Sequence, residues 1–274
     1  MEFETTFGTD RPVIGMVHLP PLPGTPRATA TAAATMERVV DRAAADAAAL
    51  DRGGVDGVVV ENFGDAPFVP DDVPKHTVAA TTRAATAVAD ATDLPVGINV
   101  LRNDAAAAMS VAAAVGAAFV RVNVHTGARV TDQGLLEGNA HDTLQLRDRL
   151  DADVGVFADV DVKHSVPVSG AGDVESVADT VGRGLADAVI ASGRGTGEPL
   201  AASALGAVVE ERDAAGVDAP VIVGSGVTAE TIGTVLDVAD GAIVGTALKE
   251  DGETTAPVDP DRVAALVARA NEVR

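Results

Sequence analysis

Two apolar stretches of this sequence, 119–125 and 154–163, carry charged or polar side chains at alternating positions. These side chains belong to Arg121, Asn123, His125, Asp159, Asp161 and Lys163. Carboxylates and imidazoles can move protons, while a lysine can stabilise a developing anion or attack a carbonyl carbon. Burying such groups without partners costs several kcal/mol, by an order-of-magnitude figure. The two stretches are therefore the first candidates for a catalytic site.

Glycine-containing segments follow three later apolar runs, and their composition suits an anion. Glycine lets backbone N–H groups approach a phosphate, and neighbouring hydroxyl groups can add donors. The predicted phosphate-binding residues are Ser192, Gly193, Thr196, Gly224, Ser225, Gly226, Gly245 and Thr246. Glycine also ends strands for steric reasons, and the 192–199 segment could equally be a flexible turn. The segments at 224–228 and 244–247 together favour phosphate binding more than any single glycine does.

The elements that must position these residues alternate regularly along the chain. Apolar runs predict strands at 12–19, 57–62, 95–101, 119–125, 154–163, 188–193, 220–226 and 241–248. Alanine-rich stretches predict helices near 31–52, 76–92, 104–115, 139–150, 173–184, 200–215, 228–237 and 259–272. Eight strand–helix units without a change of composition predict one (β/α)8 barrel over residues 1–274. A doubly wound open sheet is the alternative. The count of eight favours the barrel, as do phosphate signals after strands seven and eight.

Side chains alternate between the two faces of a strand, so the pattern also predicts orientation. Valines suit the outer face of a barrel strand, which helices cover, and the polar sets should then point inward. By the same argument Asn99 points inward, and His18 follows Ile14 and Met16 on strand one. The structural alternative is an ion network satisfied within the protein, such as Arg121 with Glu61.

We predict that Asp159 and Lys163 act at the mouth of the barrel, with His164, Asn123 and Glu61 as neighbours. A protonated lysine would stabilise an enolate or alkoxide, whereas a lysine with a lowered pKa could form a Schiff base. Nearby carboxylates favour the protonated role. The predicted substrate-binding residues are His18, Asn99, Arg102, Asn103, Arg121, His125, Asp132 and Asp161. The proline-rich loop 18–26 is either a lid or a rigid cover.

Composition limits the partners. The chain has 20 basic and 41 acidic residues, a net charge of −21, and no cysteine. This balance argues against nucleic acid and anionic membranes, and no apolar run is long enough to span a bilayer. We expect a cytoplasmic protein, and scarce lysine with a dense carboxylate surface indicates a halophilic origin. No cofactor is predicted, but Glu61, Asp159 or Asp161 could hold a divalent metal.

Long motifs in this chain resemble the BtpA/SgcQ family over almost the whole length. The matching segments are GMVHLPPLPGTPR at 15–27, GVDGVVVENFGDAPF at 54–68, LPVGINVLRNDAAAA at 94–108, VRVNVHTGARVTDQGLLEG at 120–138, FADVDVKHS at 157–165, GTGEP at 195–199, PVIVGSGVT at 220–228 and DGAIVGTALKEDGETTAPVD at 240–259. The resemblance implies a TIM-barrel enzyme of the ribulose-phosphate-binding type. One branch of the family is named for photosystem I biogenesis, and another is associated with sugar metabolism.

Two functions follow as hypotheses. The first is an enzyme acting on a phosphorylated sugar or nucleotide-derived sugar, as a lyase, isomerase or transferase. The second is a non-catalytic assembly factor of the kind that the photosystem I branch name implies, although the halophilic, archaeal character of the composition argues against a photosystem role. Inward polar residues favour the enzyme, whereas a contiguous exposed apolar patch would favour a binding protein. A second copy of the chain is a further candidate partner.

Overall fold

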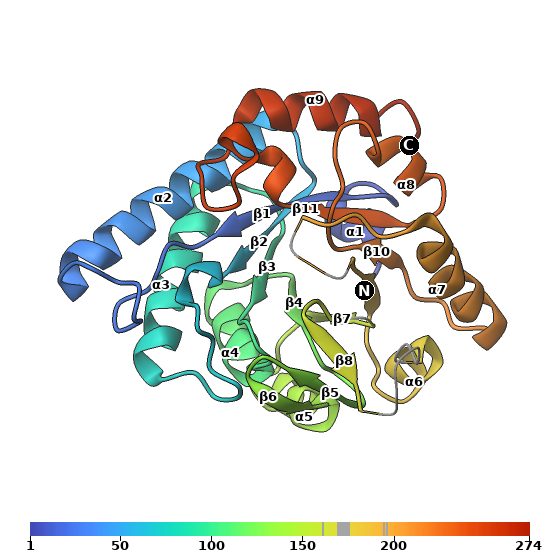
Figure 1. Ribbon diagram of the computed structural model, residues 1–274, viewed down its shortest axis with the longest axis horizontal. Coiled ribbons are helices and arrows are strands. Elements are labelled where there is room, and N and C mark those ends of the chain that lie inside the picture. Colours follow the sequence, from blue (N-terminus) through green and yellow to red (C-terminus); the bar gives the residue numbers. More distant parts are fainter. Residues whose placement is uncertain (161, 169–175, 194, 196) are drawn as a thin grey trace.

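The computed structural model describes residues 1–160, 162–168, 176–193, 195 and 197–274 (Figure 1). Its parallel strands close into a barrel in the order β1-β2-β3-β4-β7-β9-β10-β11, with β11 pairing back to β1. The barrel strands are β1 (Val13–His18), β2 (Gly57–Glu61), β3 (Val96–Asn99), β4 (Phe119–Val122), β7 (Gly155–Asp159), β9 (Ala188–Ala191), β10 (Val221–Val223) and β11 (Gly241–Val244). The predicted eight-stranded barrel is confirmed.

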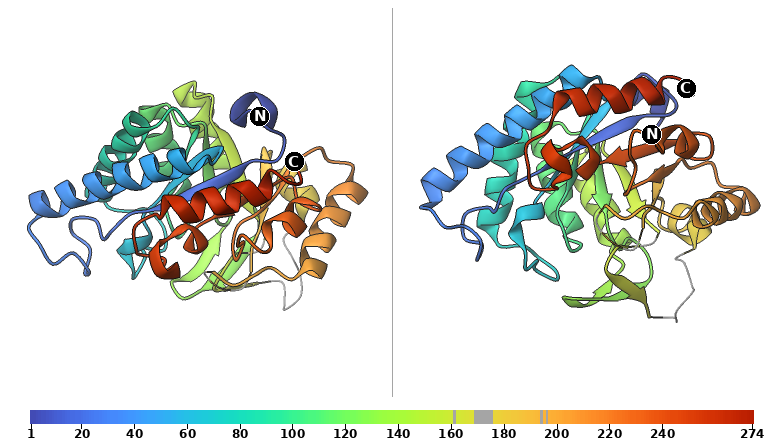
Figure 2. Two further views of the ribbon diagram at one scale, coloured as in Figure 1. Left: turned by 90° about the horizontal axis from the view of Figure 1, so that it is seen from above. Right: turned by 45° about the horizontal axis from the view of Figure 1, so that its top comes forward.

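Helices surround this barrel on the outside (Figures 1 and 2). They are α2 (Ala32–Gly53), α3 (Lys75–Ala91), α4 (Ala105–Val115), α5 (Ala140–Leu150), α6 (Val177–Gly182), α7 (Ala202–Ala215), α8 (Ile232–Leu236) and α9 (Pro260–Ala270). Asp259 caps α9 through bonds from the N–H groups of Asp261 and Arg262, and Pro260 opens the helix as predicted. None of the helices in the described ranges is long and apolar enough to cross a membrane.

The core has two layers that match the alternation of the strands. Outward residues such as Val58, Val60 and Val120 pack against the helices in one large cluster. Inward residues form a second cluster in the lower barrel: Ile14, Met16, Val59, Phe119, Phe157, Ile190, Ile222 and Ile243. The polar members of the same inward rows lie above this apolar layer, toward the C-terminal ends of the strands.

A short N-terminal helix, α1 (Phe3–Phe7), closes the bottom of the barrel and was not predicted. Phe3 and Phe7 are buried there, with ring centroids 5.6 Å from Phe157 and 5.9 Å from Phe119, respectively. Phe119 and Phe157 stack on each other at 4.3 Å. This aromatic plug fills the end of the barrel opposite the polar residues.

The predicted strand boundaries at 119–125 and 154–163 were too long, because the chain leaves the barrel earlier. The strand β4 ends at Val122 and β7 ends at Asp159. The segments that follow contribute to a small antiparallel sheet of β5 (Ala128–Thr131), β6 (Gly134–Glu137) and β8 (Ser165–Pro167). This sheet projects from the barrel rim (Figure 2). It was not predicted.

Two predicted helices are shorter than expected. Residues 228–237 form a helix only over α8, because turns occupy 229–231. Within 173–184, α6 covers 177–182, and residues 169–175 lie outside the described part of the chain. Short 3-10 turns complete the mouth: η1 (Phe63–Asp65), η2 (Thr246–Leu248) and η3 (Glu250–Gly252).

Candidate functional site

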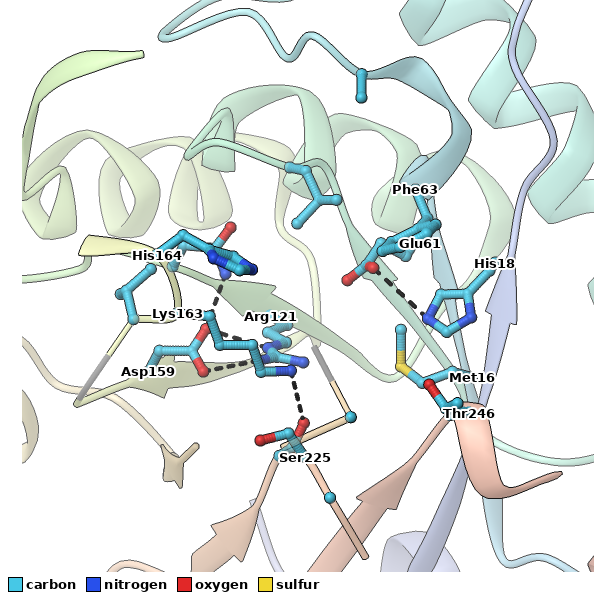
Figure 3. Close-up of a pocket in the computed structure, with 18 of the residues that line it drawn as sticks. Met16, His18, Glu61, Phe63, Arg121, Asp159, Lys163, His164, Ser225 and Thr246 are labelled. Carbon is cyan, nitrogen blue, oxygen red and sulfur yellow. Dashed lines mark hydrogen bonds and ion pairs between the residues drawn. The ribbon is translucent and has the colours of Figure 1, made fainter. Parts of the chain in front are cut away.

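A cavity of about 580 Å³ opens at the C-terminal ends of the barrel strands. Side chains and loops that follow β1, β2, β4, β7, β10 and β11 line it (Figure 3). The predicted site residues among its lining are His18, Glu61, Arg102, Arg121, Asn123, Asp132, Asp159, Lys163, His164, Gly224, Ser225, Gly226, Gly245 and Thr246. The fold thus gathers residues from 18 to 246 in one chamber. This is the usual position of an active site in such barrels.

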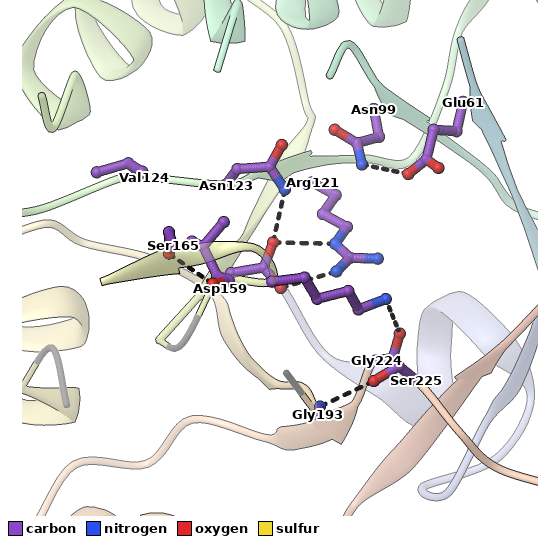
Figure 4. Close-up of polar contacts among 12 residues, drawn as sticks. Glu61, Asn99, Arg121, Asn123, Val124, Asp159, Ser165, Gly193, Gly224 and Ser225 are labelled. Carbon is purple, nitrogen blue, oxygen red and sulfur yellow. Dashed lines mark hydrogen bonds and ion pairs between the residues drawn. The ribbon is translucent and has the colours of Figure 1, made fainter. Parts of the chain in front are cut away.

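Arg121 and Asp159 form the floor of the polar part (Figure 4). Arg121 donates from Nε to Asp159 Oδ2 at 3.1 Å and from Nη2 to Oδ1 at 2.8 Å. Asn123 Nδ2 donates to the same Oδ2 at 2.8 Å. All three side chains are buried, so the polar rows point inward as expected. The carboxylate of Asp159 therefore accepts three hydrogen bonds from two residues, and Arg121 pairs with it rather than with Glu61.

Glu61 lies across the cavity in a different environment. Asn99 Nδ2 donates to Glu61 Oε2 at 2.6 Å, and His18 Nε2 lies 3.8 Å from Oε1. Burial raises the pKa of the Glu61 carboxyl, while the charges of Arg121 and Lys163 act in the opposite direction. Burial thus favours the protonated form of Glu61, which suits a group that transfers a proton to or from a ligand in the cavity.

His18 remains uncharged beside Glu61. Burial, and next the charge of Lys249, lowers the pKa of His18 well below 6.5. Its ring packs against Phe63 with centroids 4.8 Å apart, and its buried Nδ1 has no partner within the described residues. A neutral imidazole with one unpaired ring nitrogen can donate a hydrogen bond to a ligand in the cavity or accept one from it.

Lys163 reaches across the mouth from the turn after β7. Its Nζ donates to the carbonyl oxygen of Gly224 at 3.1 Å. Burial, followed by the charge of Arg121, lowers the pKa of Lys163 to about 8. The amine therefore lies against the loop that follows β10.

This loop contains the strongest anion-binding feature of the cavity. Throughout the described ranges, the backbone N–H groups of Ser225, Gly226 and Val227 donate no hydrogen bond. Gly226 has φ of +70°, and a Cβ there would lie 2.3 Å from Pro199 Cα. Only glycine fits this backbone without strain. The loop thus places three consecutive N–H groups at the cavity wall that have no partner among the described residues.

The hydroxyl of Ser225 has another role than the predicted one. Its Oγ accepts a bond from Gly193 N at 2.8 Å and donates to the carbonyl oxygen of Glu198 at 3.3 Å. The side chain therefore braces the loop after β9 against the loop after β10. Ser192 and Gly193 are buried behind this contact and do not line the cavity. The predicted Thr196 lies outside the described residues.

The loop after β11 meets His18. A Cβ on Gly245 would lie 2.9 Å from His18 Cε1, so a side chain at this position would displace the imidazole. Thr246 Oγ1 shares a hydrogen bond of 2.9 Å with Thr254 Oγ1. Gly245 and Thr246 line the cavity as predicted.

Arg102 enters the cavity from the loop after β3. Its Nη1 donates to the Lys163 carbonyl at 3.2 Å, and its Nη2 lies 3.4 Å from Asp132 Oδ1. Asn103 holds this loop in place, because it exchanges two bonds with the backbone of Val124 and donates a third to Glu137. Arg102 and Asn103 both have positive φ, 47° and 89°. Asn103 thus positions Arg102 and does not itself line the cavity.

Some predicted residues lie away from the cavity or only at its rim. His125 Nε2 bonds the carbonyl oxygen of Gly184 at 2.7 Å, outside the cavity lining. Asn99 contacts the cavity only through Glu61. His164 is at the rim, exposed, with φ of 56°. Asp161 lies outside the described residues.

The lining residues that were absent from the predicted site include a basic one and two aromatic ones, Arg27, Phe63 and Phe68. All three lie in loops after β1 and β2 whose motifs were noted for their prolines and glycines. The loop after β1 is pinned rather than free. Leu22 N donates to Asp65 Oδ1 at 2.8 Å, and Gly64 N donates to the Leu19 carbonyl at 3.0 Å. These bonds favour the rigid cover over the mobile lid.

The cavity lining has more basic than acidic side chains, whereas the whole chain has more acidic than basic residues. The described lining contains four basic side chains, Arg27, Arg102, Arg121 and Lys163, against three carboxylates, Glu61, Asp132 and Asp159. The chain overall has twice as many acidic as basic residues. An excess of positive charge in one chamber favours an anionic ligand. Within the described residues, no group of three histidine or acidic side chains is placed to hold a metal ion.

Comparisons with known proteins agree with the motifs and the fold. A sequence profile of the BtpA family matches residues 9–272. The "Photosystem I biogenesis protein BtpA" of Synechocystis sp. is 45% identical over 267 residues, 97% of this chain and 90% of that protein. An uncharacterised protein of Thermococcus kodakarensis is 46% identical over 275 residues, 100% of this chain and 98% of that protein. A solved thiamine phosphate pyrophosphorylase from Pyrococcus furiosus shares the fold, with a TM-score of 0.58, 14% identity, and coverage of 96% and 97%.

Proposed function

The chain belongs to the BtpA family, and we propose that it is an enzyme acting on a small phosphorylated substrate at the mouth of its barrel. The observation that carries the proposal is the row of N–H groups at Ser225, Gly226 and Val227, which donate to no described residue and lie next to the amine of Lys163. A phosphate group needs several convergent donors and a nearby positive charge. This wall offers both.

The rest of the substrate would lie between the phosphate loop and the opposite wall. Glu61 and Lys163 are the reacting groups in this proposal, because Glu61 can carry a proton and Lys163 holds an amine in the chamber. Asp159 and Asn123 act as positioning residues, since they hold Arg121 in place. The reaction class is a lyase, isomerase or transferase step at carbon near the phosphate.

Thermal unfolding in the presence of phosphorylated metabolites tests the proposal. We expect a phosphorylated sugar to raise Tm, while the same sugar without its phosphate does not. A ligand at 100 times its Kd adds about 2.7 kcal/mol of stability. If no phosphorylated compound shifts Tm, the phosphate site is wrong. For a compound that binds and reacts, Lys163→Met should reduce turnover about 10²-fold or more while the variant stays folded.

One observation favours a second function, that of an assembly or docking factor. Val130, Leu135 and Val166 share one face of the β5-β6-β8 sheet, and Val168 directly follows β8; these side chains are 47%, 54%, 55% and 57% exposed, in that order. Val130 pairs with Leu135 on one side and with Val166 on the other, so these side chains form a continuous row. A contiguous exposed apolar surface commonly binds another protein. Capture of a specific partner that Leu135→Asp abolishes would support this function, and the Synechocystis relative carries a biogenesis name.

A further inference from the structure

The chain has three lysines, and they lie in three different environments. Lys75 is exposed at the start of α3. Lys249 is fully buried outside the cavity lining, where its Nζ donates to the Met16 carbonyl at 3.0 Å and lies 3.3 Å from Asp46 Oδ2. Lys163 alone lines the cavity. Lys75 and Lys249 therefore serve as an exposed and a buried control for the cavity amine of Lys163.

Lys163 differs from Lys249 in having no carboxylate partner. The hydrogen bond of its Nζ runs to the Gly224 carbonyl, and no carboxylate of the described residues forms an ion pair with it. Asp159, the nearest candidate by sequence, is already occupied by Arg121 and Asn123. The charges of Glu61 and Asp159 favour the ammonium form of Lys163, but burial and the nearby guanidinium of Arg121 outweigh them.

The electrostatics agree with this geometry. With its pKa lowered to about 8, Lys163 is uncharged in about one molecule in ten at pH 7. An uncharged amine has a free electron pair and is a nucleophile for carbonyl carbon. The expectation that nearby carboxylates would keep this lysine protonated depended on Asp159 and Asp161. Asp159 is paired with Arg121 and Asp161 lies outside the described residues, while burial of Lys163 outweighs the charge of Asp159.

We propose that Lys163 forms an imine with the carbonyl group of a phosphorylated aldehyde or ketone. This inference rests on the proposed function, because the phosphate group would hold the carbonyl near Nζ. The amine electron pair attacks the carbonyl carbon and gives a carbinolamine. One N–H proton passes to the oxygen as the carbinolamine forms. The hydroxyl group then takes up a further proton and leaves as water while the nitrogen electron pair forms the C=N bond, and loss of the remaining N–H proton leaves a neutral imine on Lys163. No oxidant or reductant is required, and the buried acid Glu61 lines the same chamber as a proton donor.

The amine of Lys163 also lies next to the loop proposed to bind phosphate. Lys163 Nζ touches the carbonyl of Gly224, and the unpaired N–H groups begin at the next residue, Ser225. A short phosphorylated carbonyl compound could therefore bind the loop with one end and meet the amine with the other. The substrate class follows: a small molecule that carries both groups within a few bonds of each other.

Pyridoxal 5′-phosphate with borohydride reduction tests the imine, because this probe has an aldehyde and a phosphate. Reduction converts each imine into a stable secondary amine that peptide mass mapping assigns to a residue. Because one pKa unit changes the uncharged fraction about tenfold, we expect Lys163 to label at least about tenfold faster than Lys75. Lys249 should not label, and the rate at Lys163 should rise with pH to a midpoint near 8. The α-amino group of Met1, which pairs with Asp187 just before β9, should label regardless of phosphate.

Three comparisons separate the inference from the proposed function. Inorganic phosphate should slow labelling of Lys163 and leave Lys75 unchanged, and pyridoxal without its phosphate should lose the preference for Lys163. Lys163→Arg should keep the positive charge, bind inorganic phosphate and show no cavity adduct. If Lys163 labels no faster than Lys75 while inorganic phosphate still raises Tm, the imine is overturned and the phosphate site stands. If Lys163 labels fast with either aldehyde and phosphate gives no protection, the amine is supported and the phosphate site fails.

Discussion

Arg121 and Asp159 face each other across the neighbouring strands β4 and β7 and form a two-pronged ion pair inside the barrel. Both side chains are buried, and Arg121 follows two positions after Phe119 of the aromatic layer. The pair therefore marks the boundary between the apolar filling of the barrel and the polar cavity above it.

Asp159→Asn should destabilise the protein strongly, because it leaves the guanidinium of Arg121 buried without a counter-charge. Breaking one partner of a buried pair costs about 3–5 kcal/mol. The free energy of unfolding in denaturant measures this loss. The double variant Arg121→Met/Asp159→Leu should recover part of it, since apolar replacements of both partners leave no charge. A single variant as stable as the parent would contradict the geometry.

Gly226→Ala should abolish binding of inorganic phosphate and phosphorylated ligands. The positive φ and the close approach of Pro199 leave no room for a Cβ, so the loop that holds the free N–H groups must move. Isothermal calorimetry with the ligand found by the Tm screen measures the loss. Gly206→Ala in α7 is the matched control, because nothing lies within 4 Å of its Cβ position. That variant should bind normally and gain about 0.5–1 kcal/mol of stability.

The buried carboxyl of Glu61 should give stability a measurable pH dependence. Burial raises its pKa in the folded chain above 4.5, so the folded state holds this proton more tightly than the unfolded state. The resulting contribution is complete below the unfolded pKa and is lost as pH rises through the folded pKa. Each unit of the shift corresponds to about 1.4 kcal/mol.

Glu61→Gln removes this ionisation and keeps an oxygen that accepts from Asn99. The stability of the parent relative to this variant should therefore decline as pH rises from about 4.5 toward neutrality. Urea unfolding of both proteins across this range gives the difference. A difference that stays constant with pH would show that Glu61 titrates normally.

Substitution by alanine should lower the stability of the protein by very different amounts at two neighbouring leucines of β6. Leu136 is 1% exposed and packs with Val124 and Val162 beneath the small sheet, whereas Leu135 is 54% exposed on its outer face. Leu136→Ala should cost about 2–5 kcal/mol, and Leu135→Ala less than about 0.5 kcal/mol. Unfolding of the isolated chain measures both. A large loss at Leu135 would mean that a second copy of the chain covers this face, and sedimentation would then show a dimer that the variant dissociates.

The periodicity of the sequence was sufficient for the barrel and for the direction of its side chains. Alternation at every second residue is a local property of a strand, so it predicted that Arg121, Asn123 and Asp159 point inward. Recurring helix and strand patterns likewise predicted eight units. The loop at 224–226 was recognisable as a candidate for phosphate binding because glycine tolerates the backbone that such a loop requires.

Only the tertiary structure decided which of these groups meet. Arg121 could have paired with Glu61 or Asp159, and the choice depends on the register of β4 against β7 and on side-chain reach across the barrel. Among the described residues that choice leaves Lys163 without an ion pair to a carboxylate, although acidic residues surround it in the sequence. Three further features also depend on tertiary contacts: the hydrogen bond from Gly193 to Ser225, the packing of Phe3 and Phe7 at the bottom of the barrel, and the β5-β6-β8 sheet. Each is a contact between segments far apart in the chain, and local periodicity carries no information about such distances.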